Sequence, residues 1–261
     1  MTKLFLSECE RIWARKSTKV LLIIMIAFQV FNFLLYQGHW KLDMCVIKKG
    51  MEIELNNLNY PVTQLIDFNA VLIFLVLPLF FTESLSLEID TGAYKMMLLR
   101  PIKKWKLIVS KWIALVVTYS IALGCVCITK CIIGNIFMPK VNATKYFFIG
   151  ANFSITDSIL YNVKYYLIVI LLHVALIGVI SLISVITRKP VLTFLGCIFF
   201  IIASLYLCKP AIDIFFNTTN IPYYILAGQY NISSIVIYII FSICCALLSL
   251  VIWNKKIGEI V

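Results

Sequence analysis

The residues whose types could do chemistry gather in one stretch of the chain, residues 83–111. Two carboxylates, Glu83 and Glu88, stand where a long apolar run ends, and a series of basic residues follows them. An ionised side chain in a membrane is costly unless it finds a partner. A carboxylate that is buried or half-buried at this point would therefore need a cation or a hydrogen-bond donor beside it.

A short helix is expected between the carboxylates and the lysines. Gly92 permits a turn or a close approach of the backbone. Tyr94–Leu99 has the pattern of a helix with one apolar face, and Arg100-Pro101 ends it, because the residue before a proline is pushed out of helical geometry. We expect this helix to lie across one end of a bundle and to offer aromatic and basic side chains to a partner. A basic loop that only anchors lipid headgroups would explain the lysines, but not the carboxylates, the glycine and the tyrosine together.

The sequence has no motif for other chemistry. Its ten glycines include no G-x4-G-K-[ST], so the chain cannot cradle nucleotide phosphates in a P-loop. Its nine cysteines lack the paired CxxC spacing of a zinc site. His173 shares one apolar run with Ser181 and Ser184, but no G-x-S-x-G nucleophile motif occurs. We therefore expect no enzymatic activity, and neither a metal nor a cofactor bound by this chain.

Composition places the chain in a membrane. Of its 261 residues, 62% are hydrophobic and 13% are charged, and the mean hydropathy is +0.99. Soluble domains are roughly 45–50% apolar and about 25% charged. The net charge of +11 does not indicate nucleic-acid binding, because the basic residues fall in short clusters between apolar runs and no nucleic-acid-binding motif is present. The expected fold is an all-α membrane protein.

Six apolar runs reach, or nearly reach, the roughly 17–25 residues that a membrane-spanning helix needs. They are Val20–Gln37, Asp67–Thr82, Leu107–Thr129, Tyr165–Thr187, Val191–Cys208 and Ser233–Trp253. The second run is short and contains Pro78, which should kink or break it. We predict one bundle of six transmembrane helices over residues 20–253.

The leader, residues 1–19, has the pattern of an amphipathic helix in the membrane interface. Phe5, Cys9, Ile12 and Trp13 follow helical spacing on one side, with charged residues on the other. A plain basic flank ahead of the first span is the alternative, and the periodicity favours the helix.

The basic residues orient the bundle. Of 23 Lys and Arg residues, 15 fall in the leader, in 83–111, in the short loop 188–190 and in the tail 254–261. Since segments rich in Lys and Arg stay on the cytoplasmic side, both termini are predicted to be cytoplasmic.

The last outer loop, residues 209–232, is half apolar and broken by Pro210 and Pro222. It is too short and too broken to cross a bilayer, but it could dip into the outer leaflet as a re-entrant segment. An ordinary surface loop with aromatic side chains against lipid is an equal alternative.

The 83–111 stretch resembles the signature of ABC type-2 exporter permeases, E-x4-E-x3-G-[AT]-Y-K-x-x-L-x-R-P-I-x-x-x-K-x-x-x-x-K. The matching positions are Glu83, Glu88, Gly92, Ala93, Tyr94, Lys95, Leu98, Arg100, Pro101, Ile102, Lys106 and Lys111. Ala93 stands where the family usually has threonine, and Lys103-Lys104 where it often has arginine. The leader, the six runs and the short inner loop 188–190 are also similar to that family, so the likeness covers nearly the whole chain in topology.

The resemblance implies a permease of the bacterial plasma membrane that works with a separate ABC ATPase subunit. That subunit would bind the ATP and Mg²⁺, and a second permease copy, identical or paralogous, would complete the pathway. In that family the leader helix and the connection between the second and third spans contact the ATPase. By resemblance, residues 84–106 form a cytoplasmic coupling helix.

The same likeness assigns candidate site residues. The candidate ATPase-coupling residues are Glu83, Glu88, Gly92, Tyr94, Lys95, Arg100 and Pro101. The candidate contacts of the leader helix are Glu8, Arg11 and Trp13. Asp213, Phe215 and Phe216 would belong to an outer gate in a re-entrant hairpin.

The implied function is export of a hydrophobic or amphipathic substrate, for which a peptide toxin or antimicrobial peptide is the best match. Lipid-linked glycans, drugs and sodium stay open as cargo. Two other classes also stay open, an intramembrane enzyme and an ion-coupled carrier that works without an ATPase. The first needs a nucleophile and a base within reach of each other, and the second typically has inverted repeats and paired intramembrane charges. The sequence shows neither pattern.

Overall fold

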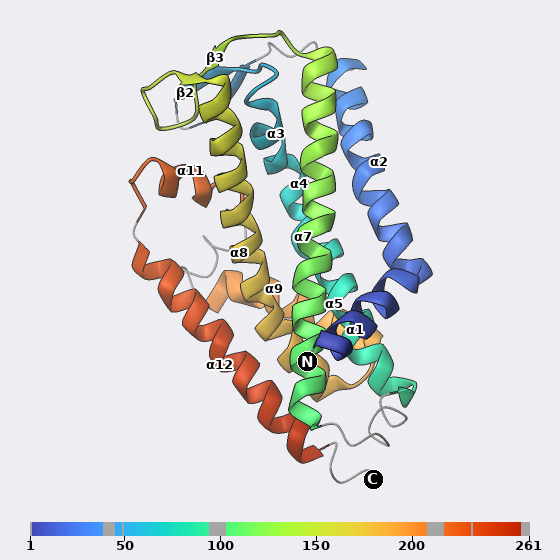
Figure 1. Cartoon of the computed structure of the whole chain (residues 1–261). Helices are drawn as coiled ribbons and strands as arrows, with labels where there is room; N and C mark the ends of the chain where they lie inside the picture. The colour runs from blue at the N-terminus through green and yellow to red at the C-terminus, as the bar shows by residue number, and fades with distance from the viewer. Residues whose placement is uncertain are drawn as a thin grey trace.

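A computed structural model of the chain describes residues 2–38, 45–48, 50–93, 103–207, 217–230 and 232–256. In these ranges the chain forms a helical bundle with two small antiparallel hairpins at one end (Figure 1). We call this end the hairpin end. The opposite end carries α1 and the last turns of α12, and we call it the α1 end.

The described ranges contain helices of very different length. Their bounds are α1 Thr2–Ala14, α2 Lys16–Gly38, α3 Tyr60–Thr63, α4 Leu65–Val71, the π-helical turn η1 Leu72–Val76, α5 Leu77–Asp90, α7 Lys104–Phe137, α8 Ile155–Thr187, α9 Pro190–Leu207, α11 Ile221–Leu226 and α12 Ile232–Lys256. The hairpins pair β1 (Cys45–Lys48) with β2 (Met51–Glu54), and β3 (Ala143–Thr144) with β4 (Phe153–Ser154).

Five helical segments are long and apolar enough to cross a bilayer. They are Lys16–Leu35, Tyr60–Asp90, Lys104–Phe137, Ile155–Thr187 and Ser233–Lys255. The all-α class and the multi-pass membrane character are therefore as predicted, and the apolar faces of these helices are suited to contact with lipid.

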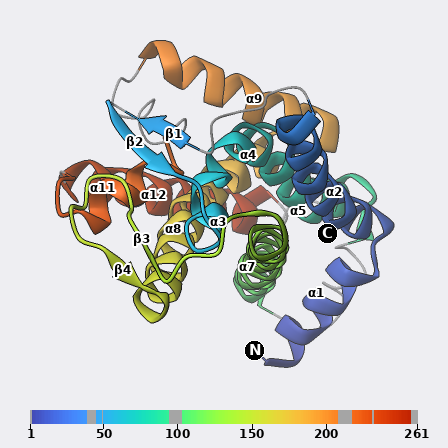
Figure 2. The same ribbon diagram turned by 90° about the horizontal axis from the view of Figure 1, so that it is seen from above.

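The prediction of a sixth span is not confirmed. The run Val191–Cys208 corresponds to α9, whose apolar part, Pro190–Ser204, is shorter than the other five. Figure 2 shows α9 running across the field of view, whereas α7 is seen end-on. Hydropathy alone does not show this direction, because an apolar helix scores the same whether it crosses the bundle or runs along it.

The kink expected at Pro78 appears as a change in helix type. The π-helical turn Leu72–Val76 lies directly before α5, which carries Pro78 in its first turn. Proline lacks the N–H for the usual helical bond and its ring crowds the preceding turn, so a wider turn relieves the clash. The span is also longer than predicted, because it begins at Tyr60 and continues to Asp90.

Helix α8 is the centre of the bundle and has defined ends. Ser154 caps its start by accepting a hydrogen bond from the backbone N–H of Asp157. At its other end Arg188 is left-handed, with φ of 59°, and Pro190 begins α9 two residues later. Helices α5, α9, α11 and α12 all pack on α8.

Helices α8 and α12 approach each other closely at Gly178. A Cβ added to Gly178 would lie 2.2 Å from the carbonyl oxygen of Ser242. The Ser242 hydroxyl donates a hydrogen bond to the Ala175 carbonyl across this contact. Small residues let two membrane helices approach this closely, which gains van der Waals contact that larger side chains would prevent.

We expect Gly178→Ala to destabilise the bundle, because the new methyl group forces α8 and α12 apart. The free energy of unfolding should fall by about 1–3 kcal/mol, as for other overpacked sites. Gly124→Ala on α7 is the matched control, since a Cβ there meets nothing within 4 Å. Thermal unfolding followed by tryptophan fluorescence should show a lower melting temperature for Gly178→Ala alone, and equal melting of the two variants would contradict the close contact.

Candidate functional site

Five charged side chains form one ion cluster at the α1 end. Glu8 and Arg11 come from α1, Arg15 from the joint between α1 and α2, Glu88 from the last turns of α5, and Lys111 from α7. We call this set the ion cluster. The side chains of Glu8, Glu88 and Lys111 are 3%, 7% and 1% exposed, so they form a buried centre, whereas Arg11 and Arg15 are partly exposed at its edge.

The ion cluster is a closed ring of hydrogen-bonded ion pairs. Arg11 donates to Glu8 at 2.9 Å and, through its other terminal nitrogen, to Glu88. Lys111 donates to the second oxygen of Glu88 and to Glu8 at 3.0 Å. Arg15 adds a third cation on Glu88 at 2.5 Å. Both oxygens of each carboxylate are therefore engaged, and Glu88 is shared by three cations.

Local sequence explains how the ring closes. Glu8 and Arg11 are three residues apart on α1, so they lie on one face of that helix. Ile12, which is 2% exposed, packs beside them and fixes this face against the bundle. Lys111 lies two turns into α7, the helix on which α1 packs. Removing one partner from such a set costs several kcal/mol, because the remaining charge stays buried without compensation.

The ion cluster unites residues that the sequence placed separately. Glu8, Arg11 and Glu88 were candidate residues of two different segments, and the structure brings them into direct contact. Lys111 and Arg15 were not among the candidates. They could have been sought from the sequence, because a buried carboxylate such as Glu88 needs a cation beside it.

The position expected for Glu8 on α1 differs from the structure. The pattern placed Trp13 on the apolar side, which would lie in the membrane interface, and Glu8 among the charged residues on the other side. In the structure Trp13 is 37% exposed and Glu8 is buried. The pairing of Glu8 with Arg11 and Lys111 removes the cost of burial, which a count of apolar positions does not consider.

The other candidate residues have different surroundings. Glu83 is half-buried on α5 and has no ion-pair partner in the described ranges. Gly92 has φ of 68°, so this glycine makes the turn that ends α5, as predicted. Outside the described residues lie Tyr94, Lys95, Arg100, Pro101, Asp213, Phe215 and Phe216.

Hydroxyl groups connect the helix of Glu88 to α8 and α9. The Ser86 hydroxyl lies 2.8 Å from that of Ser184 and 2.7 Å from that of Thr193. Thr193 also lies 2.6 Å from the Thr187 hydroxyl. Ser86 is on the turn that precedes Glu88, so the ion cluster and this hydroxyl group set belong to one packed layer.

A second set of polar bonds extends this layer to α7 and α12. The indole N–H of Trp112 donates to Ser181 at 3.0 Å, and the Ser181 hydroxyl lies 3.1 Å from that of Ser249. Trp112 directly follows Lys111 on α7. The α1 end is therefore held together by polar contacts among α1, α5, α7, α8, α9 and α12.

His173 is part of a buried network nearer the middle of the bundle. Its Nδ1 lies 2.7 Å from the Tyr119 hydroxyl and its Nε2 lies 3.2 Å from the Thr218 hydroxyl. Thr218 in turn donates to Asn69 at 2.5 Å. The series fits a neutral His173 with its proton on Nε2. Tyr119 then donates to Nδ1, Nε2 donates to Thr218, and Thr218 donates to Asn69. This arrangement fits a packing role, because the two ring nitrogens face the hydroxyls of Tyr119 and Thr218.

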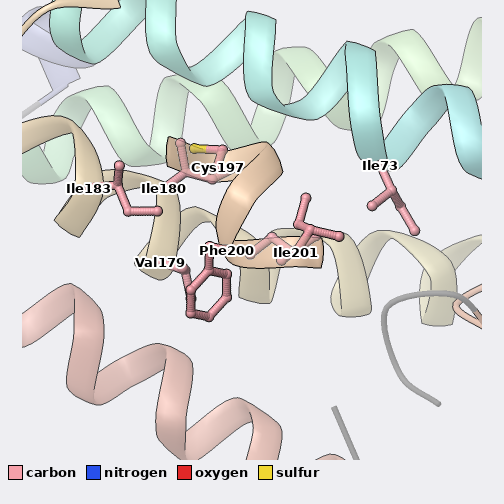
Figure 3. Close-up of a pocket in the computed structure, with 8 residues that line it drawn as sticks. Ile73, Val179, Ile180, Ile183, Cys197, Phe200 and Ile201 are labelled. Carbon is pink, nitrogen blue, oxygen red and sulfur yellow. The ribbon is translucent and has the colours of Figure 1, made fainter. Parts of the chain in front are cut away.

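One apolar pocket lies beside the π-helical turn (Figure 3). Its cavity volume is only about 10 Å³, and Ile73 of η1, Ile180 of α8 and Phe200 of α9 lie in its wall. Its other lining residues are Leu176, Val179, Ile183, Cys197 and Ile201. Apart from the Cys197 thiol these side chains carry no polar atom, so the pocket has nothing to orient a polar ligand.

The described ranges contain no group of three or more His, Cys, Asp or Glu side chains that could hold a metal ion. On α1, burial raises the pKa of the Cys9 thiol, and the adjacent Glu8 carboxylate raises it further. A thiol with a raised pKa is a poor nucleophile and a poor metal ligand.

Comparison of the chain with protein-family models, with curated proteins and with solved structures finds no match. The functional argument therefore depends on the chain's own residues and their geometry.

We expect Glu88→Gln to lower the free energy of unfolding by about 3–5 kcal/mol, because the buried Lys111 and the partly buried Arg11 and Arg15 would all lose a carboxylate partner. Glu83→Gln is the matched control on the same helix and should change the free energy of unfolding by less than about 1 kcal/mol. Adding Lys111→Met to Glu88→Gln should restore part of the loss, since the double variant regains the net charge of the original cluster. Thermal or denaturant unfolding in detergent measures all three, and equal effects of the two glutamate variants would contradict the ion cluster.

Proposed function

We propose that this chain is the membrane-spanning permease subunit of an ATP-driven exporter. A separate ABC ATPase subunit would bind ATP and Mg²⁺, and a second permease copy would complete the pathway. The chain itself would have no enzymatic activity. Its place would be a bacterial plasma membrane, with both termini and the 91–103 connection on the cytoplasmic side.

The observation that carries the proposal is the position of the ion cluster. Glu88 lies just before the 91–103 connection and Lys111 just after it, and both pair with charges of α1. A force on the connection would therefore reach α1, α5 and α7 together. That is the mechanical property that a coupling segment needs, because nucleotide-driven closure of an ATPase must move several helices as a unit.

The polar contacts beyond the ion cluster support the same role. Ser86, Ser184 and Thr193 link α5 to α8 and α9, and Ser181 links α7 to α12 through Trp112 and Ser249. Movement at the α1 end would thus be shared by the whole bundle. A lipid-anchoring loop would have no need of this internal connection.

The cargo is proposed to be hydrophobic or amphipathic. The helix faces that look outward are covered by isoleucine, leucine, valine and phenylalanine side chains, and the pocket beside η1 is apolar. A peptide toxin or antimicrobial peptide fits such surfaces better than a highly charged solute. Six spans remain part of the proposal, with α9 as the sixth if it turns along the bundle in the assembled exporter.

The two alternatives have less support. An intramembrane enzyme needs a nucleophile beside a base, and His173 instead binds a tyrosine and a threonine that already donates to Asn69. An ion-coupled carrier needs buried charges along its pathway. Of the buried charged residues in the described ranges, Glu8, Glu88 and Lys111 belong to the ion cluster at one end, and Lys130 of α7, which is 2% exposed, lies outside it.

The test is to purify the chain alone and together with any P-loop ATPase that is encoded beside its gene. We expect ATP hydrolysis only in the complex, and vesicles containing the chain alone should not move a fluorescent hydrophobic peptide. Transport by the chain alone, or failure of every neighbouring ATPase to co-purify, would overturn the proposal.

We further expect Tyr94→Ala to uncouple transport from ATP hydrolysis while membrane insertion stays intact, because Tyr94 lies at the centre of the coupling segment proposed for 84–106. Tyr206→Ala is the matched control, since this tyrosine is 86% exposed on α9. Peptide transport per ATP hydrolysed should fall at least about tenfold in the first variant, which corresponds to about 1.4 kcal/mol of lost coupling. Equal ratios in both variants would contradict the assignment.

A further inference from the structure

The described part of the last loop, residues 217–230, is docked into the bundle. We call it the outer segment, and it contains α11. Thr218, Thr219 and Tyr223 are 0%, 1% and 0% exposed. Tyr165 of α8 donates a hydrogen bond to the Thr219 carbonyl. Figure 1 shows α11 beside the upper part of α8, below the hairpins.

A second loop holds the outer segment from the other side. We call residues 145–150 the clasp loop. The Phe147 ring meets the Tyr223 ring edge-on, with centroids 5.3 Å apart. The Phe148 ring stacks on the Tyr224 ring at 4.5 Å with an interplanar angle of 22°. Two consecutive aromatic residues of the clasp loop therefore contact two consecutive aromatic residues of α11.

The clasp loop has an unfavourable backbone at the point of contact. Phe148 has φ of 64°, a left-handed conformation that a bulky side chain rarely adopts. The one other non-glycine residue with positive φ in the described ranges is Arg188, which caps α8 where such a conformation is common. Phe148 caps no helix, so neighbouring contacts must maintain its conformation.

We propose that the clasp loop is a strained latch, in which stacking of Phe148 on Tyr224 holds an unfavourable backbone that relaxes when the outer segment undocks. The stack and the polar bonds to α8 favour the docked state, and the backbone of Phe148 favours release. Contributions that oppose each other in this way allow a segment to switch between two positions. This inference does not need the proposed function. In an exporter the latch would determine how readily the hairpin end opens.

Hydrogen–deuterium exchange of the chain in lipid nanodiscs tests the latch. The reporters are the backbone amides of Tyr223, Ala227 and Gln229, which are hydrogen-bonded within the outer segment at 3.1, 3.0 and 2.9 Å. Tyr224→Leu and Phe148→Leu both remove the stack. We expect exchange of these amides to become about threefold to tenfold faster in each variant, since an aromatic pair contributes modestly to stability.

Phe148→Asn separates strain from stacking. It also removes the ring, but asparagine tolerates the left-handed conformation. We expect exchange about threefold slower in Phe148→Asn than in Phe148→Leu, because relief of strain favours the docked state. Phe137→Leu is the control for loss of an aromatic pair elsewhere at the hairpin end, since the ring centroids of Phe137 and Phe33 lie 4.5 Å apart. It should leave the three amides unchanged.

The results decide both parts of the proposal. Unchanged amide exchange in Tyr224→Leu and Phe148→Leu would overturn the claim that the stack holds the outer segment in place. Equal exchange in Phe148→Leu and Phe148→Asn would overturn the claim that backbone strain at Phe148 favours release. None of these measurements uses an ATPase or a cargo, so failure of the latch and failure of the proposed function can be told apart.

Discussion

The structure depends on one shared carboxylate. Glu88 accepts hydrogen bonds from Arg11, Arg15 and Lys111, so that α1, the start of α2, α5 and α7 meet at a single charged group. An apolar contact at this place could slide, because dispersion forces have little direction. Ion pairs with defined hydrogen bonds fix the relative positions of the helices, and they do so in a site from which water is largely excluded.

Such a cluster contributes more to selecting one arrangement of the helices than to the free energy of unfolding. Burying the charges of Glu8, Glu88 and Lys111 has a large desolvation cost, and an apolar set of similar volume would often be as stable or more stable. The benefit is a single arrangement of helices, because any other register leaves a buried charge unpaired. The hydroxyl contacts of Ser86 and Ser181 have the same character, since each is satisfied in this arrangement. The α1 end is thus built for a unique geometry, which is what a segment that transmits movement requires.

Much of the fold follows from the sequence, and the exceptions share a cause. Hydropathy located the five long apolar helices, and Pro78 located the distorted turn. The predicted spans were too short where a polar residue interrupts an apolar run. Lys130 ended one predicted run at Thr129, yet α7 continues to Phe137 with Lys130 only 2% exposed. Asn162 similarly lies in α8 before the predicted start, paired with the Tyr146 hydroxyl at 3.0 Å. A hydropathy scale scores each residue alone, whereas burial of a polar residue depends on a partner that is distant in sequence.

The same reasoning explains why the candidate site was predicted only in part. Glu88 could be recognised as a carboxylate in need of a cation, but any of several basic residues could have supplied it. The choice of Lys111 depends on how α1 packs on α7, and that in turn depends on Ile12 and on Glu8 turning inward. Residues 8, 88 and 111 are distant in the chain, so spacing carries no information about their contact. The two ends of the bundle consequently differ in kind. The α1 end is fixed by charges that satisfy one another, whereas aromatic rings stack at the hairpin end around the left-handed backbone of Phe148. In the proposed exporter the first end would transmit force and the second would yield to it.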